Sequence, residues 1–208
     1  MKGLLLKDFY IIRDNLLIIA ITFIAVGSGM AFLVSPWVLI VIASVILSNL
    51  AASTIINDNT SQWSKFAATL PVRKQQVISS KYILYLLLCL CGIIAGIIIS
   101  SGLAIIRQEF EMESIFLYFN VGLIVSLISG SVMIPCNFIF REEKSVLSMI
   151  LSYIATSVLF VAYILIANSF IDVKNNLLLV CGIGSIVGIV TYFISWMVAR
   201  KHLPYGTI

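Results

Sequence analysis

The chain has 208 residues, of which 61% are hydrophobic and 11% are charged, and its formal net charge is +4. Soluble proteins carry about a quarter charged residues, so this composition excludes a water-soluble globule, and the high hydrophobicity excludes intrinsic disorder. One crossing of a bilayer takes about 20 residues, so the length suits roughly six crossings and leaves little for a separate domain. We therefore predict one all-α, polytopic membrane domain over residues 1–208, with six transmembrane helices.

The first predicted element comprises residues 1–14, which precede the first long apolar stretch. Leu5, Phe9 and Ile12 recur at helical spacing on one side of this segment, whereas Lys7 lies opposite. The pattern is typical of an interfacial helix that runs along the cytoplasmic surface of the membrane. A simple cytoplasmic extension of the first span fits the pattern as well.

Six apolar stretches are each long enough to span the hydrocarbon core of a bilayer. They cover residues 15–34, 37–56, 82–106, 115–140, 146–168 and 177–199. Glycines at four-residue spacing, Gly92 with Gly96 and Gly184 with Gly188, allow close helix packing, either within the chain or between two copies. Pro135 is expected to kink the fourth span, and Asn137 is close enough to bond the carbonyl that the proline frees.

The distribution of positive charge predicts the orientation of these spans. Eleven of the 13 lysines and arginines lie before the first span, between the second and third, between the fourth and fifth, or after the last. By the positive-inside rule these segments face the cytoplasm. We therefore expect a multi-pass protein of the cytoplasmic membrane, with both termini and residues 57–81 on the cytoplasmic side.

Residues 57–81 form the longest predicted cytoplasmic segment, and a short helix is expected within it. Its apolar residues recur at i, i+3, i+4 and i+7: Trp63, Phe66, Ala67 and Leu70. Ser61 is a suitable N-cap, and Pro71 ends the helix. So short a helix needs a surface on which to bury its apolar side, namely the bilayer, its own chain or a groove on a cytosolic protein.

The predicted spans lack the residues that catalysis or metal binding would require. None of the six stretches contains a charged residue, the single histidine, His202, lies near the end of the chain, and the four cysteines lie in apolar runs. We therefore expect no catalytic site, no metal site and no nucleic-acid partner. The sequence also lacks the phosphate-binding pattern GxxxxGK[ST], so any nucleotide-driven action requires another subunit.

Two short sequences, GLLLKDF at residues 3–9 and TLPVR at residues 69–73 followed by SKY at residues 80–82, accompany the six spans. With this topology, the chain resembles the membrane (permease) subunit of bacterial type-two ABC exporters. One departure is that only residues 168–176 connect the last two spans, where many relatives have a helical insertion.

The resemblance implies an elbow helix at residues 1–14, carried by Leu5, Phe9 and Ile12, and a coupling helix that docks on an ABC ATPase subunit. The docking residues that it implies are Trp63, Phe66, Ala67, Leu70, Pro71 and Arg73. It further implies pairing with a second permease copy or a paralogue within the membrane lipid. ATP and Mg²⁺ would be bound by the ATPase subunit, and this chain would hold no cofactor.

The expected function is that of the transmembrane subunit of an ATP-driven exporter. Because the membrane path offers few fixed charges, we expect a hydrophobic or amphipathic substrate, such as a peptide or a lipid-like molecule, to be moved out across the cytoplasmic membrane. Two alternatives remain open. The chain could be a non-transporting membrane scaffold or immunity protein, or a transporter driven by an ion gradient.

Overall fold

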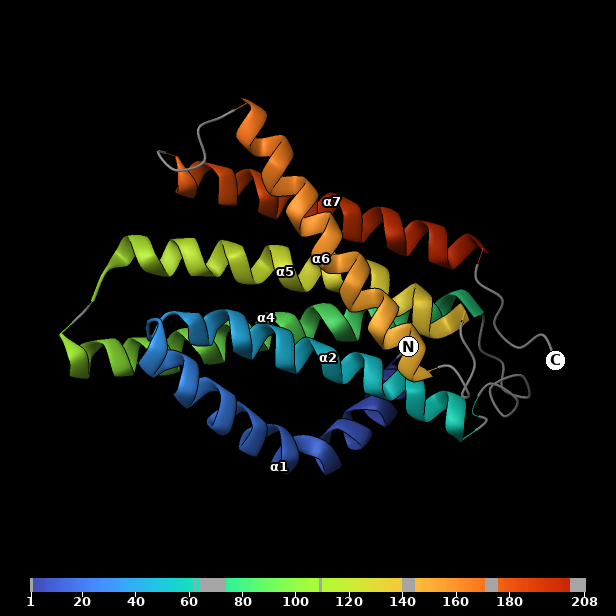
Figure 1. The fold of residues 1–208 in the computed structure, drawn as a ribbon. Coiled ribbons are helices and arrows are strands. Elements are labelled where there is room, and N and C mark those ends of the chain that lie inside the picture. Colours follow the sequence, from blue (N-terminus) through green and yellow to red (C-terminus); the bar gives the residue numbers. More distant parts are fainter. Residues whose placement is uncertain are drawn as a thin grey trace.

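A computed structural model describes residues 2–61, 63, 74–108, 110–139, 145–170 and 176–202. In these residues the fold is helical, without strands, and it is shown in Figure 1. The helices are α1 (Lys2–Leu33), α2 (Val38–Thr60), α4 (Lys74–Arg107), α5 (Met112–Ile139), α6 (Ser145–Phe170) and α7 (Leu177–His202). All six contain a stretch that is long and apolar enough to cross a membrane. The predicted all-α class is therefore confirmed for the described residues, and so is the prediction of six helices apolar enough to span a membrane.

The helices extend beyond the predicted spans, most of all at the start of α1. Residues 2–14 and the first span form one continuous helix, because nothing in the sequence before Leu33 breaks it. Figure 1 shows that α1 is bent, so that its amino-terminal part runs in a different direction from the rest of the helix. Both expectations for residues 1–14, an interfacial helix and an extension of the first span, require this segment to be helical.

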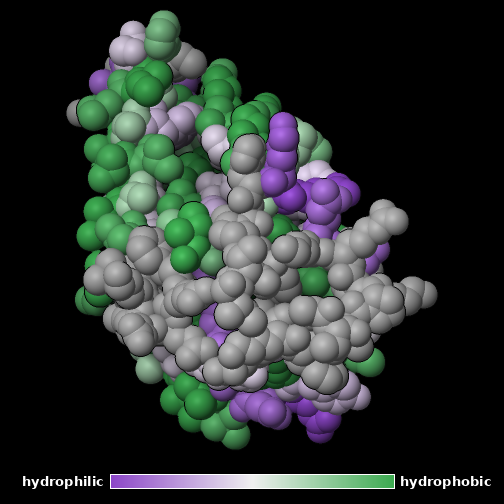
Figure 2. Space-filling model, turned by 90° about the vertical axis from the view of Figure 1, so that its right-hand side faces the viewer, coloured by the Kyte–Doolittle hydropathy of each residue, from purple (hydrophilic) through white to green (hydrophobic). Residues whose placement is uncertain are grey.

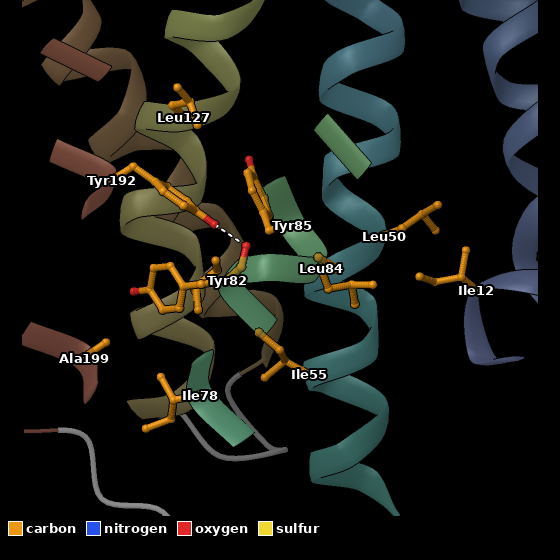
Figure 3. Close-up of a cluster of buried hydrophobic side chains, with 12 residues drawn as sticks. Ile12, Leu50, Ile55, Ile78, Tyr82, Leu84, Tyr85, Leu127, Tyr192 and Ala199 are labelled. Carbon is orange, nitrogen blue, oxygen red and sulfur yellow. Dashed lines mark hydrogen bonds between the residues drawn. The ribbon is translucent and has the colours of Figure 1, made fainter. Parts of the chain in front are cut away.

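The arrangement of the bundle places α5 at its centre. α5 packs against α2, α4, α6 and α7, whereas α1 packs mainly on α2 and lies on the opposite side of the molecule from α7 (Figure 1). A core of apolar side chains from α1, α2, α4, α5 and α7 fills the inside of one half of the bundle (Figure 3). The outward sides of the helices carry many exposed leucine, isoleucine, valine and phenylalanine side chains, as expected of surfaces that contact lipid.

The glycine pairs pack helices within the chain. A Cβ atom added at Gly92 would lie 2.6 Å from the Ala43 carbonyl oxygen, and one added at Gly96 would lie 2.6 Å from the Cα atom of Ile40, so α4 and α2 touch backbone to backbone. A Cβ atom at Gly184 would lie 2.6 Å from the Ile124 side chain, which places α7 close to α5. The sequence allowed these glycines to pack helices either within the chain or between two copies. In the structure, they make contacts within the chain.

Pro135 lies inside α5 and has no N–H to offer the carbonyl of Ser131 one turn earlier. The Ser195 hydroxyl of α7 donates to that carbonyl at 2.5 Å. The Asn137 side chain, which the sequence offered for this carbonyl, donates to the carbonyl of Met133 at 3.0 Å. Since Ser195 uses its hydrogen on Ser131, the Tyr82 hydroxyl of α4, 2.9 Å away, must donate to Ser195. Three helices are thus joined at the proline.

Replacing Ser195 with alanine is expected to lower the free energy of unfolding by about 1 kcal/mol, because the Ser131 carbonyl and the Tyr82 hydroxyl both lose their partner inside the bundle. Thermal unfolding of the detergent-solubilised protein measures the change. Ser157→Ala is the control, since the exposed Ser157 hydroxyl bonds only within its own helix. Equal effects of the two substitutions would contradict the role given to Ser195.

Candidate functional site

Four charged side chains from three helices meet at the end of the bundle where α1 begins and α7 ends, which we call the terminal end (Figure 1). They are Lys7 and Asp8 of α1, Asp58 of α2 and Lys81 of α4, and we call them the ion cluster. Figure 2 looks onto the terminal end, where hydrophilic side chains gather, while hydrophobic ones cover much of the visible flank. Two positive and two negative charges cancel, so the cluster is neutral as a whole.

Lys81 is the centre of the ion cluster and is only 2% exposed. Its ammonium group lies 2.8 Å from Asp8 Oδ1 and 2.7 Å from Asp58 Oδ2. It also donates to Thr54 Oγ1 at 3.1 Å, so each of its three hydrogens has an acceptor. A buried lysine is tolerated only when it is paired in this way. Lys81 therefore ties α4 to both α1 and α2.

The two carboxylates are placed by their helices. Asp8 is 1% exposed and shares one side of α1 with Leu5 and Ile12, so the carboxylate enters the bundle together with these apolar side chains. Asp58 lies in the last turn of α2, where the helix dipole disfavours a negative charge. Its carboxylate is compensated there by Lys7 and Lys81, which bind one oxygen each.

Lys7 connects the ion cluster to Trp63. Its ammonium group makes a close ion pair with Asp58, lies 3.5 Å from Asp8 Oδ1, and lies 4.2 Å from the centroid of the Trp63 ring. The last contact has the geometry of a cation–π interaction. Trp63 follows the end of α2 by three residues and is half-buried. The predicted docking residue at this position is thus in contact with α1.

The other predicted docking residues, namely Phe66, Ala67, Leu70, Pro71 and Arg73, lie outside the described residues. The residues predicted for the elbow helix are all described. Ile12 is buried in the apolar core, Leu5 packs against the same core, and Phe9 is 58% exposed. Leu5 and Ile12 therefore face the bundle, and Phe9 faces away from it.

The opposite end of the bundle is held by a different set of contacts. Arg107, at the end of α4, donates to the carbonyl of Ala31 in α1 at 2.9 Å, and its guanidinium lies 4.9 Å from the centroid of the Phe32 ring. Trp37 and Phe110 pack edge to face with their ring centroids 5.9 Å apart. α1 and α4 are thus linked at both of their shared ends, by the ion cluster and by Arg107.

The ion cluster was not predicted from the sequence, because Asp8, Asp58 and Lys81 all lie outside the six predicted spans. A signal was available, since each of the three lies at helical spacing from residues that are now seen to be buried, such as Ile12, Ile55 and Ile78. The two sequences that carry the family resemblance, GLLLKDF and SKY, contribute Asp8 and Lys81 respectively, and these residues bind each other.

The charged side chains of the site bind one another and hold helices together. Among the described residues, no group of three or more histidine, cysteine, aspartate or glutamate side chains is arranged to hold a metal ion. Several polar side chains inside the spans join helices, as where the Ser185 hydroxyl donates to Asn120 Oδ1 at 2.6 Å between α7 and α5. The ion cluster is therefore suited to holding three helices together at one end.

Comparisons with known proteins gave one finding. Residues 3–203 match the family model described as ABC-2 family transporter protein. A search of the curated proteins and a search of the solved structures gave no match.

Proposed function

The chain belongs to the ABC-2 transporter family, whose membrane subunits work with an ABC ATPase subunit, and from this premise we propose that it is the permease of an ATP-driven exporter. The observation that carries the proposal is the family match over nearly the whole chain, together with six helices that are apolar enough to span a membrane. In this proposal the terminal end of the bundle faces the cytoplasm, as the distribution of lysine and arginine predicts.

The proposed docking site for the ATPase is the coupling segment at residues 57–81, with contacts from Trp63, Phe66, Ala67, Leu70, Pro71 and Arg73. Supporting this assignment, Trp63 lies three residues after the end of α2, and the segment leads into α4, so a displacement here acts on two helices whose backbones touch. The ATP-bound and nucleotide-free states of the ATPase must contact the segment differently, because a ligand shifts an equilibrium only by its differential affinity. Residues 1–14 serve as the elbow helix of the same unit.

The proposed substrate is hydrophobic or amphipathic, a peptide or a lipid-like molecule, and it moves out of the cell. In support, none of the six apolar stretches contains a charged residue, and the four charges of the ion cluster cancel one another. A small ion that moved between such helices would meet no side chain of opposite charge. A second copy of the chain or a paralogue completes the path, with lipid around it.

Trp63→Ala and Phe66→Asp are expected to weaken association with the ABC ATPase subunit at least about tenfold, since an aromatic anchor at an interface contributes 1.4 kcal/mol or more. Insertion into the membrane should be normal. Co-purification of the permease with its ABC ATPase subunit, and the rate of ATP hydrolysis with and without the permease, measure the effect.

Phe170→Ala is the matched control for these variants, because Phe170 is an 83% exposed aromatic residue at the carboxyl end of α6, far along the chain from the coupling segment. Unchanged association and unchanged ATPase stimulation in the Trp63 and Phe66 variants would reject the docking assignment. A chain that never co-purifies with an ATPase would support the scaffold or immunity function instead.

Transport is tested in proteoliposomes that contain the permease and its ATPase. A fluorescent amphipathic peptide and a fluorescent phospholipid serve as the two substrate probes, and ATP-dependent movement of either one is the expected result. Movement that follows an imposed ion gradient without ATP would reject ATP-driven export and would favour a gradient-driven transporter.

A further inference from the structure

The ion cluster attaches α1, a helix that does not adjoin the coupling segment in the sequence. The segment connects α2 and α4 covalently, whereas α1 begins elsewhere in the sequence. In the structure, Lys7 and Asp8 of α1 lie against Asp58 at the end of α2 and against Lys81 near the start of α4. The point where α2 ends and α4 begins is therefore also the point where α1 is attached.

Apolar packing alone attaches α1 only weakly to α4. α1 packs mainly on α2, and in its spanning part most side chains are exposed on the outside of the bundle. Apolar side chains slide past one another at little cost, whereas separating Lys81 from two carboxylates would leave buried charges without a partner. The ionic contacts are therefore the part of the contact between α1 and α4 that resists movement most strongly.

Lys7 extends the attachment to Trp63, the predicted docking residue. Its ammonium group pairs with Asp58, lies near Asp8, and lies over the Trp63 ring, so one side chain of α1 touches both the other charges of the ion cluster and Trp63. Through its contact with Lys7, a displacement of Trp63 is expected to act on the two carboxylates that Lys7 pairs with.

We propose that the ion cluster is a joint that makes the amino-terminal part of α1 move with the start of α4 when the ATPase acts on the coupling segment. Asp8 and Lys81 are then positioning residues for coupling. This inference rests on the proposed function and deepens it, since it assigns to α1 a share in the response to the ATPase. Without the joint, the response would be confined to α2 and α4.

The test uses the paired substitution Asp8→Asn with Lys81→Met in the complex of permease and ATPase. This variant removes one charge of each sign and leaves Asp58 paired with Lys7, so no buried charge is left alone. The matched control is Arg107→Met, which removes the side chain that links α4 to α1 at the opposite end of the bundle. A merely structural role of such links would give the two variants similar effects.

The first measurement is the stimulation of ATP hydrolysis by the permease. The paired variant is expected to associate with the ATPase but to lose stimulation at least about fivefold, while Arg107→Met stays within about twofold of the unsubstituted protein. Equal stimulation in the unsubstituted protein and the paired variant would overturn the joint. If the unsubstituted chain does not associate with an ATPase at all, the proposed function itself fails, and this inference fails with it.

The second measurement includes an arm that uses only the chain with the joint intact. Spin labels at the exposed positions Tyr10 of α1 and Ile83 of α4, in a chain whose own cysteines have been replaced, report the distance between the two helices. With the joint intact, this distance is expected to be the same in the nucleotide-free and ATP-bound complexes. In the paired variant it is expected to shift on ATP binding. A shift of the same size with the joint intact would overturn the proposal.

Discussion

Replacing Lys81 with methionine alone is expected to lower the free energy of unfolding by about 3–5 kcal/mol, because two buried carboxylates then share one remaining cation. Asp8 is 1% exposed and would retain only Lys7, whose ammonium group lies 3.5 Å away and is already paired with Asp58. The loss is measured by thermal unfolding of the purified protein, and it should also appear as a lower amount of folded protein in the membrane.

The variant that carries both Lys81→Met and Asp8→Asn separates this electrostatic cost from simple loss of packing. Replacing a whole buried pair with neutral residues of similar size is close to neutral, whereas removing one partner is not. The double variant should therefore be more stable than Lys81→Met, although it carries one substitution more. A double variant that is less stable than the single one would show that the charges in the ion cluster do not depend on one another.

The second large effect is expected at the glycines where α4 touches α2. Gly96→Ala should destabilise the protein by about 1–3 kcal/mol, since the new Cβ atom would lie 2.6 Å from a backbone carbon of α2 and could be accommodated only by separating the helices. Gly92→Ala should act in the same direction, because its Cβ atom would meet the Ala43 carbonyl. Thermal unfolding in detergent again provides the measurement.

Gly102, which lies in the same helix, provides the control for this prediction. An added Cβ atom at Gly102 meets no other atom within 4 Å, so Gly102→Ala should be neutral or stabilising by up to about 1 kcal/mol through its higher helix propensity. The two substitutions are chemically the same and are expected to differ in sign. Destabilisation of equal size at Gly102 and Gly96 would contradict the close contact between α4 and α2.

The sequence was sufficient to predict the number and class of the helices, because a bilayer requires long apolar stretches and the chain contains six of them. It was less informative about where the helices end. α4 begins at Lys74, eight residues before the predicted third span, because polar residues such as Gln75 and Ser79 continue a helix although they do not contribute to an apolar stretch. Hydropathy thus marks the part of a helix that lies in lipid and omits the rest.

The partners of individual side chains could not be predicted, because they depend on contacts between distant parts of the chain. The glycine spacing indicated close packing of a helix, but it could not identify α2 as the neighbour of Gly92 and Gly96. Likewise, the carbonyl freed by Pro135 is bonded by Ser195, 64 residues away from Ser131, and no local pattern connects the two. Asp8 and Lys81 are 73 residues apart and belong together for the same reason.

The shape of the site around Lys81 has a consequence of its own. Acceptors approach its nitrogen from three helical positions, Asp8, Thr54 and Asp58, which suits the tetrahedral geometry of a primary ammonium. Arginine would bring the same charge as a flat fork with five donors, and the extra donors would have to find acceptors in a space that is closed to solvent. The position therefore selects for the geometry of the cation as well as for its sign, and an exchange that looks conservative on paper would be a substantial change here.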